Sequence, residues 1–235
     1  MFSESGNGYL RTDCNEAGFT FADLNAITHL GKSTKKGVTN GQRGYIGEKG
    51  IGFKSVFKAA DVVHISSGYY EFKLDRNGHL GMVLPIHSTF PRGQRLPDHT
   101  QFLLLLNSEK YYTEIENDLC NIEPQLLIFL KNLQALNIQI GDNRKSYHIQ
   151  VGTSATLGEI ATINSNHQGD GQPKEMKYAI ARYRTSEIPK DKRREGITAS
   201  EIVLAFPIER AKPKIGPQKA FAFLPIDDFG FKVSS

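Results

Sequence analysis

The chain has 235 residues and a formal net charge of +4, with 39% hydrophobic, 10% aromatic and 23% charged residues. This is the composition of an ordinary globular protein, and it excludes a disordered, fibrous or collagen-like chain. A net charge this small does not indicate a nucleic-acid-binding protein, so nucleic acid is not expected as a partner. The basic excess in residues 171–200 is interpreted as a solvated loop.

Cys14 and Cys120 lie far apart, without paired spacing or a neighbouring group of histidines. The sequence therefore predicts neither a disulfide framework nor a zinc site. The longest apolar runs are much shorter than the roughly 18 residues that a membrane-spanning helix needs. The N-terminus has no secretory apolar region, so we expect no membrane partner and a cytoplasmic or nuclear location.

The first half of the chain predicts short strands and two helices. Residues 9–13 alternate weakly, as a strand does. Thr20 with Asp23 three residues later predicts a helix N-terminus, and apolar residues at helical spacing follow as far as Gly31. A second amphipathic helix is predicted to begin at Phe53. Further strands, two of them joined by a Ser67-Gly68 turn, are predicted at residues 62–66, 69–75, 82–86 and 101–106.

The second half predicts a buried helix after Pro124 and a surface loop at residues 162–174. Strands are predicted at residues 137–140, 146–151, 178–183, 202–206 and 220–224. This order predicts an α+β protein, a two-layer α/β sandwich with helices on one face of a mixed, mostly antiparallel sheet. We expect residues 1–160 to form one domain and residues 161–235 to begin a following segment.

Residues 31–52 are rich in glycine and lysine and have almost no apolar periodicity. Glycines let the backbone approach phosphate oxygens, and a helix N-terminus directs unpaired N–H groups at an anion. The loop is interpreted either as a nucleotide-binding loop or as a flexible turn. Gly31-Lys32-Ser33 ends like a P-loop, but Ala26 stands where its first glycine is required. No Rossmann G-x-G-x-x-G pattern is present.

Three segments resemble, in order, the motifs of the GHKL superfamily, which includes gyrase, MutL, histidine kinases and the heat-shock chaperone. They are residues 15–20 (NEAGFT), 30–35 (LGKSTK) and 44–57 (GYIGEKGIGFKSVF). The same block is similar to the ATP-binding region of sacsin and NO VEIN-like proteins. The resemblance implies the Bergerat fold, in which ATP lies between helices and sheet under a mobile lid.

The resemblance also implies roles for individual residues. Glu16, or Asn15 if the register differs by one, resembles the acceptor for the exocyclic amine of adenine, and Thr100 resembles a threonine that helps to hold adenine. The lid segment near the ribose or terminal phosphate is matched by Lys32, Ser33, Thr34 and Lys35. The glycine box, whose backbone amides meet the phosphates, is matched by Gly47, Gly50, Gly52 and Phe53, with Lys54 next to it.

The residues alone leave simpler interpretations open. Glu16 is equally a solvated acid in a turn, and Thr100 an ordinary strand threonine. Lys54 is equally a solvated helix lysine, and residues 32–35 a polar loop. The order of the three motifs favours the nucleotide site.

In the family, a helix before the first strand supplies a Glu that activates water and an Asn that holds Mg²⁺. Residues 1–8 alone precede the first predicted strand, so we expect a chain shortened at its N-terminus, with no catalytic residue or metal ligand assigned. The prediction is an ATP-binding module with a nucleotide-responsive lid and a chaperone-like or conformational-switch role, in which Mg²⁺ lacks its ligand helix. The alternative is a nucleotide-independent scaffold whose exposed sheet a protein partner or further chain segment covers.

Overall fold

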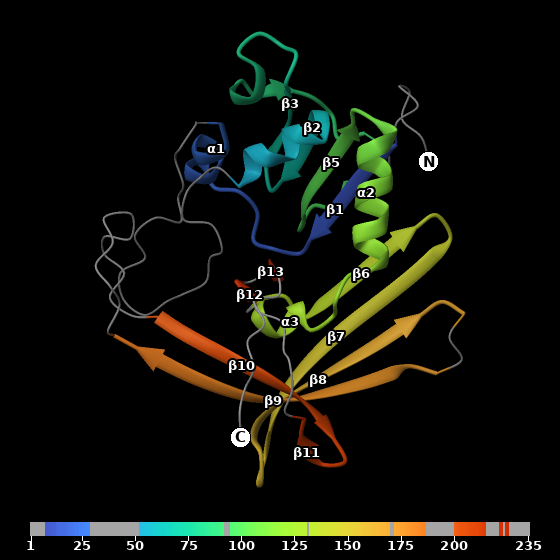
Figure 1. Cartoon of the computed structure of the whole chain (residues 1–235). Helices are drawn as coiled ribbons and strands as arrows, with labels where there is room; N and C mark the ends of the chain where they lie inside the picture. The colour runs from blue at the N-terminus through green and yellow to red at the C-terminus, as the bar shows by residue number, and fades with distance from the viewer. Residues whose placement is uncertain are drawn as a thin grey trace. The chain divides into compact units, whose positions relative to one another are not determined.

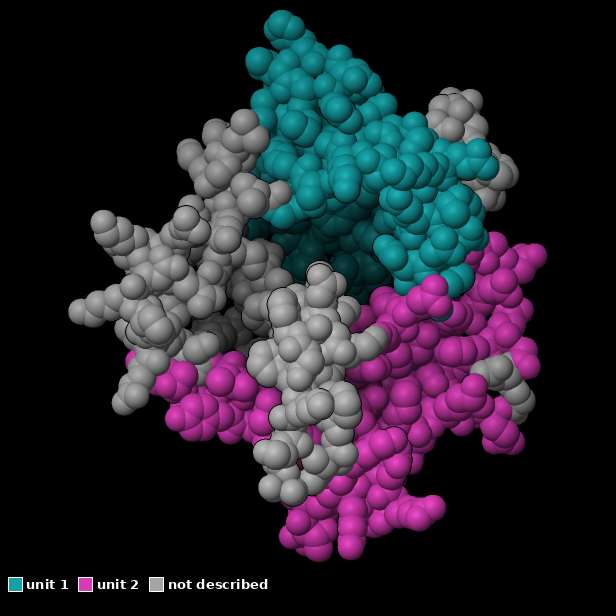
Figure 2. Space-filling model, viewed as in Figure 1, with its two compact units in different colours: residues 1–38, 45–120 teal, residues 39–44, 121–235 magenta. Residues whose placement is uncertain are grey.

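The computed structural model describes residues 8–28, 52–91, 95–130, 132–169, 172–186, 200–214, 221–222 and 224–225. The chain forms two compact units, which we call unit 1 and unit 2 (Figure 2). Unit 1 comprises residues 1–38 and 45–120, and unit 2 comprises residues 39–44 and 121–235. All strand pairs described in them are antiparallel. The protein is therefore of the α+β class.

Unit 1 contains a five-stranded sheet with the order β1-β5-β2-β3-β4 (Figure 1). Its strands are β1 (Tyr9–Cys14), β2 (Ala60–Ser67), β3 (Tyr70–Asp75), β4 (Ile86–His87) and β5 (Thr100–Leu106). The predicted hairpin of β2 and β3 is confirmed, and Gly68 in its turn has φ +57°. Glycine takes this conformation without the steric cost that other residues incur.

One face of this sheet carries the core of unit 1. Alternation along β2 and β5 places Val63, Ile65 and Leu104 on this face, and all three are buried. The face is packed against α1 (Phe21–Thr28), the 3₁₀ helix η1 (Phe53–Lys58) and α2 (Glu109–Cys120). Figure 1 shows α2 running alongside β5.

The predicted helix N-terminus at Thr20 is confirmed as the start of α1. The Thr20 N–H donates to Asp23 Oδ2 at 3.0 Å, and the Asp23 N–H donates to Thr20 Oγ1 at 3.2 Å. This reciprocal pair is a capping box, which satisfies two backbone donors that the helix itself leaves unpaired.

Two predicted elements of unit 1 are corrected. The helix that begins at Phe53 is the six-residue 3₁₀ helix η1 rather than an α-helix, and it ends just before Ala60 pairs in β2. Short connecting helices of this length are often of the tighter 3₁₀ type. The strand predicted at 82–86 is restricted to β4. Residues before it form the short 3₁₀ helix η2 (Gly81–Val83), which follows Leu80 at φ +63°.

Unit 2 contains a six-stranded sheet with the order β11-β10-β9-β8-β7-β6. The strands are β6 (Ala135–Ile140), β7 (Asn143–Ser154), β8 (Gly158–His167), β9 (Lys174–Thr185), β10 (Ser200–Glu209) and β11 (Lys212–Pro213). The short helix α3 (Leu126–Phe129) and the strands β12 (Phe221–Ala222) and β13 (Leu224–Pro225) complete the unit. The last two pair with each other and lie beside α3.

The loop predicted at residues 162–174 is wrong over its first half. β8 extends to His167 and pairs with β7 and β9, with Ala161, Ile163 and Ser165 on its buried face and polar residues between them. These polar residues belong to the solvated face of the strand. Their polarity is the reason that the sequence predicted a loop here. The helix after Pro124 is only α3, because the backbone at Leu130 (φ −92°, ψ 86°) leaves the helical region.

The domain boundary expected at residue 160 differs from the division into compact units, which falls after Cys120. β6 pairs with β7, β7 with β8 and β8 with β9, so hydrogen bonding assigns residues 135–160 to unit 2.

Thr20→Ala is expected to lower the free energy of unfolding by about 1 kcal/mol, because an α1 backbone donor loses its cap. Asp23→Ala should do the same, and the double variant should cost less than the sum, since both residues serve one capping box. Guanidinium unfolding followed by far-UV circular dichroism measures all three. Additive effects would contradict the reciprocal capping box.

Candidate functional site

The adjoining ends of β2 and β5 carry four polar residues that are at most 1% exposed: Ser66, Ser67, Thr100 and Gln101. The register pairs Ser67 with Thr100 and Ser66 with Gln101. Neighbouring residues of a strand point to opposite faces, so the first pair lies on the core face and the second on the other face. Buried polar groups are costly unless hydrogen-bonded. We call these four residues the polar end of the sheet.

On the core face, the hydroxyls of Ser67 and Thr100 are 2.6 Å apart, and the Phe19 N–H donates to Ser67 Oγ at 2.8 Å. Gly18 has φ +86°, and a Cβ at this position would lie 3.2 Å from the Gly68 nitrogen. Both the conformation and the close approach require glycine. The predicted adenine-reading segment is thus anchored on the polar end at Gly18 and Phe19.

Asn15 and Glu16 lie in the exposed connection between β1 and α1. Burial, followed by the charge of the Glu16 carboxylate, raises the pKa of the Cys14 thiol, while a hydrogen bond from the Glu16 backbone lowers it. Cys14 is opposite Thr100 in the β1–β5 register. The structure therefore brings Glu16 to the same end of the sheet as Thr100. The Thr100 hydroxyl itself is buried and contacts Ser67.

The glycine-box segment contacts strand β5 at Phe102, which also contacts Phe19 of the segment predicted to read adenine. The ring centroid of Phe102 lies 6.2 Å from that of Phe19 and 5.9 Å from that of Phe53. Phe102 is two residues after Thr100 and shares its face of β5. We call Phe19, Phe53 and Phe102 the aromatic cluster, and all three side chains are only partly buried. Three segments far apart in the sequence thus meet at one end of the sheet.

Gly52 has an ordinary helical backbone, with φ −57° and ψ −47°. A Cβ added there would have no neighbour within 4 Å among the described residues. Glycine in a helical conformation is about 1 kcal/mol less favourable than alanine. Neither backbone conformation nor packing by the described residues therefore explains a glycine here.

The ammonium group of Lys54, a predicted phosphate-site residue, is hydrogen-bonded to another residue of unit 1. Its ammonium donates to the Met82 carbonyl and lies 5.8 Å from the centroid of the Phe53 ring, and burial lowers its pKa. The predicted residues that lie outside the described residues are Lys32, Ser33, Thr34, Lys35, Gly47 and Gly50.

Sequence reasoning missed Ser67 and Gln101 as parts of this site. The sequence predicts Ser67 only as a turn residue and Gln101 only as the first residue of a strand. The signal for both was a pair of polar residues at the end of one apolar strand and another pair at the start of a second. Only strand pairing shows that the two pairs are neighbours.

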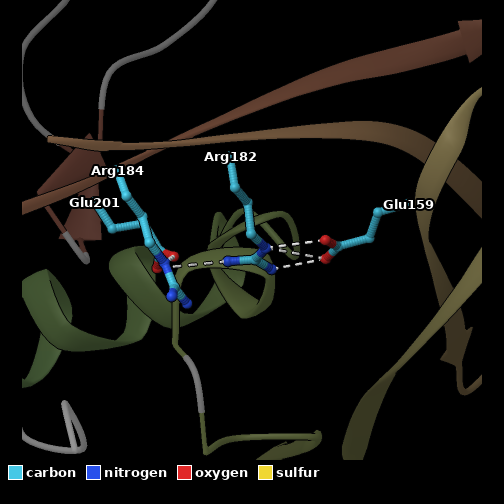
Figure 3. Close-up of polar contacts among 4 residues, drawn as sticks. All are labelled: Glu159, Arg182, Arg184 and Glu201. Carbon is cyan, nitrogen blue, oxygen red and sulfur yellow. Dashed lines mark hydrogen bonds and ion pairs between the residues drawn. The ribbon is translucent and has the colours of Figure 1, made fainter. Parts of the chain in front are cut away.

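Unit 2 carries a separate polar cluster on a groove lined by residues of α3 and β7–β10 (Figure 3). Arg182 binds Glu159 with two nitrogens, at 3.0 Å from Nε to Oε2 and 2.7 Å from Nη2 to Oε1. Glu201 lies between two guanidinium groups, 3.8 Å from Arg182 Nη1 and 3.2 Å from Arg184 Nε. The Glu201 side chain is only 7% exposed, so the arginines offset the cost of burying its charge.

Cys14 and Cys120 are not joined in a disulfide. No group of three or more His, Cys, Asp or Glu side chains that could hold a metal occurs in the described ranges. None of the helices seen there has both the length and the apolar character needed to cross a bilayer.

The fold and site define an α+β protein in which one end of a sheet brings residues of the first and third sequence motifs together with strand β5. The chain is similar to Protein NO VEIN of Arabidopsis thaliana, with 37% identity over an alignment 141 residues long that covers 52% of this chain. The match covers 5% of the length of that relative. No known protein-family profile matches the chain. The relationship to NO VEIN-like proteins that the motifs indicated is therefore supported by comparison of the sequences.

Ser67→Ala is expected to lower the free energy of unfolding by about 1–3 kcal/mol, because it leaves the Thr100 hydroxyl and the Phe19 N–H without their partner. Thr100→Val removes only one contact of Ser67 and should cost less. The double variant should cost less than the sum of the two. Denaturant unfolding of the three variants measures this. Equal costs for Ser67→Ala and Thr100→Val would contradict the central position of Ser67.

The hydrogen bond from Arg182 is the main cause that lowers the pKa of Glu159 in the folded protein. A carboxyl with a lowered folded pKa stabilises the fold above its unfolded pKa, and this contribution disappears as pH falls through the folded value. We therefore expect Glu159→Gln to be less stable than wild type at neutral pH, with the difference shrinking below the ordinary value of 4.5. Urea unfolding at a series of pH values measures this. A difference independent of pH would refute the ion pair.

Proposed function

We propose that unit 1 is an ATP-binding module of the GHKL type with a Bergerat-like two-layer sandwich. The observation that carries the proposal is the meeting of the first and third motif segments with strand β5 around Phe102 and the polar end of the sheet. Residues 15–20, 52–54 and 100–102 are remote in sequence, and a nucleotide site needs them together. The similarity to Protein NO VEIN over half of the chain is consistent with this assignment.

Each part of the site suits one part of the nucleotide. The aromatic cluster offers partly exposed ring surface to an adenine base. The exposed Glu16 carboxylate is a hydrogen-bond acceptor for an exocyclic amine. No described residue lies within 4 Å of where a Cβ of Gly52 would be, and the missing side chain lets phosphate oxygens approach the backbone. The lid role of residues 32–35 stays a prediction, since these residues lie outside the described ranges.

The proposal is limited to binding. No described residue is assigned to ATP hydrolysis, and Mg²⁺ is a variable of the binding experiment. The chaperone-like or switch role and the cytoplasmic or nuclear location likewise stay predictions.

A second candidate is a nucleotide-independent scaffold, which one observation in unit 2 favours. Tyr183, Ile202 and Leu204 are 64%, 50% and 46% exposed, and Tyr183 is directly opposite Ile202 in the β9–β10 register. They lie on the face of the sheet opposite Arg182 and Glu201. Adjacent exposed apolar side chains of this size are typical of a surface that contacts another protein.

Wild-type protein is expected to bind mant-ATP saturably, and Gly52→Val to lose this binding because its side chain blocks the approach of the phosphates. Gly152→Val is the matched control, because Gly152 also has open space for a Cβ and no positive φ. Fluorescence anisotropy with and without Mg²⁺ measures the affinities. Gly50→Val, whose position lies outside the described residues, extends the test to the rest of the glycine box.

Folding of each variant is checked by its circular dichroism spectrum and melting temperature. Failure of a folded wild-type chain to bind mant-ATP would overturn the ATP-binding proposal and leave the scaffold. Equal affinities of Gly52→Val and Gly152→Val would remove the glycine box from the site.

A further inference from the structure

Residues 88–91 and 95–96 make contacts on the face of the unit 1 sheet opposite the aromatic cluster. We call these residues the strap. Ser88 Oγ lies 3.3 Å from His64 Nδ1, and the Phe90 N–H donates to Glu71 Oε1. Farther along the strap, Arg95 and Leu96 bind the polar end of the sheet from the side opposite the proposed site.

Arg95 holds the turn between β2 and β3 at two points. Its Nε donates to Ser66 Oγ at 3.0 Å, and its Nη2 donates to the Gly68 carbonyl. Ser66 is 1% exposed, so the guanidinium reaches a hydroxyl that is almost inaccessible to solvent. The planar guanidinium, with donors in fixed directions, can make both bonds at once, which an ammonium on a flexible stem does less well.

This turn supports the segment that the proposed function assigns to adenine. The Gly68 nitrogen lies 3.2 Å from where a Cβ of Gly18 would be, and Ser67 Oγ accepts the Phe19 N–H. Gly18 therefore packs against the turn with no room for a side chain. A shift of the turn must move Gly18 and Phe19 or break these contacts.

A second path leads from the strap to the start of the same segment. The Leu96 N–H donates to Gln101 Oε1 at 2.8 Å, and Gln101 Nε2 donates to Asp13 Oδ1 at 2.8 Å. Gln101 is fully buried, so both bonds satisfy groups that water does not reach. Asp13 is two residues before Asn15. The strap thus contacts the residues that hold the Asp13–Phe19 segment in place, Gln101 at its start and the β2–β3 turn at its end.

We infer that Arg95 is a positioning residue that sets the preference of the site for adenine over guanine. The inference rests on the proposed function. A carboxylate such as Glu16 accepts from the amine of adenine but meets the carbonyl oxygen of guanine at the same place. Discrimination of this kind depends on where the acceptor is held. The phosphate contacts proposed at Gly52 are the same for both nucleotides, so they do not distinguish adenine from guanine.

The test compares mant-ATP and mant-GTP binding by wild type, Arg95→Gln and Arg95→Lys. Arg76→Gln is the matched control, because Arg76 also donates to a backbone carbonyl, that of Phe57 at 3.1 Å, but near the opposite end of β2. Arg95→Gln should weaken mant-ATP binding roughly tenfold, the effect of losing about one charge-assisted hydrogen bond, and leave mant-GTP binding within about twofold. Arg95→Lys should recover part of the preference, and Arg76→Gln should keep all of it.

Hydrogen exchange without nucleotide tests the mechanical link by itself. Arg95→Gln should accelerate exchange of the Phe19 amide, and Arg76→Gln should not. A preference unchanged in Arg95→Gln would overturn the inference, as would a parallel loss for both nucleotides. A wild type that binds neither nucleotide would overturn the proposed function, while unchanged Phe19 exchange in Arg95→Gln would overturn the link even if ATP binds.

Discussion

The burial of four polar side chains at the ends of two central strands is the constraint on which unit 1 depends. Ser66, Ser67, Thr100 and Gln101 are shielded from water in a sheet whose other buried side chains are apolar. Each must find a partner, and the partners come from elsewhere in the chain: Phe19, Arg95, Leu96 and Asp13. Satisfying these groups therefore draws the first connection and the strap onto the sheet from opposite faces.

A set of buried, hydrogen-bonded polar side chains adds little to the free energy of unfolding compared with apolar side chains of the same shape. Replacing a paired set of buried polar groups by apolar groups of the same shape is often nearly neutral, whereas leaving one group unpaired is not. The polar end thus contributes specificity of position more than free energy. Its hydrogen bonds hold Gly18 and Phe19 in one position beside Phe102. A purely apolar contact would fix that position less tightly, because it is not directional. This is the property that a ligand site needs from its surroundings.

Unit 2 solves a related problem in a different way. Glu201 is nearly buried on a sheet face, and two arginines from the neighbouring strand offset its charge. The cluster links β8, β9 and β10 through side chains as well as through the backbone. The charged groups of this cluster form ion pairs with one another between neighbouring strands. We therefore interpret the cluster as a structural support of the sheet, next to the apolar residues that line the groove.

The sequence by itself determined the local elements whose signal lies within a few residues. The capping box at Thr20 and Asp23, the β2–β3 hairpin and the apolar strand β5 follow from short-range pattern. It also carried the three motifs and their order, on which the likeness to NO VEIN-like proteins depends. The helix at Phe53 was mistaken because local spacing favoured an α-helix, while pairing of Ala60 in β2 ended it early.

Only the tertiary structure decided which distant residues are neighbours. Ser67 and Thr100 are 33 positions apart and Asp13 and Gln101 are 88 apart, and no local pattern relates them. The strand β8 was missed for the same reason, since its polar residues become one face of a sheet only after β7 and β9 pair with it. Local propensity acts over a few residues, whereas strand register is fixed by burial and hydrogen bonding over the whole sheet. The elements were therefore largely readable from the sequence, and the polar end that joins them into a candidate site was not.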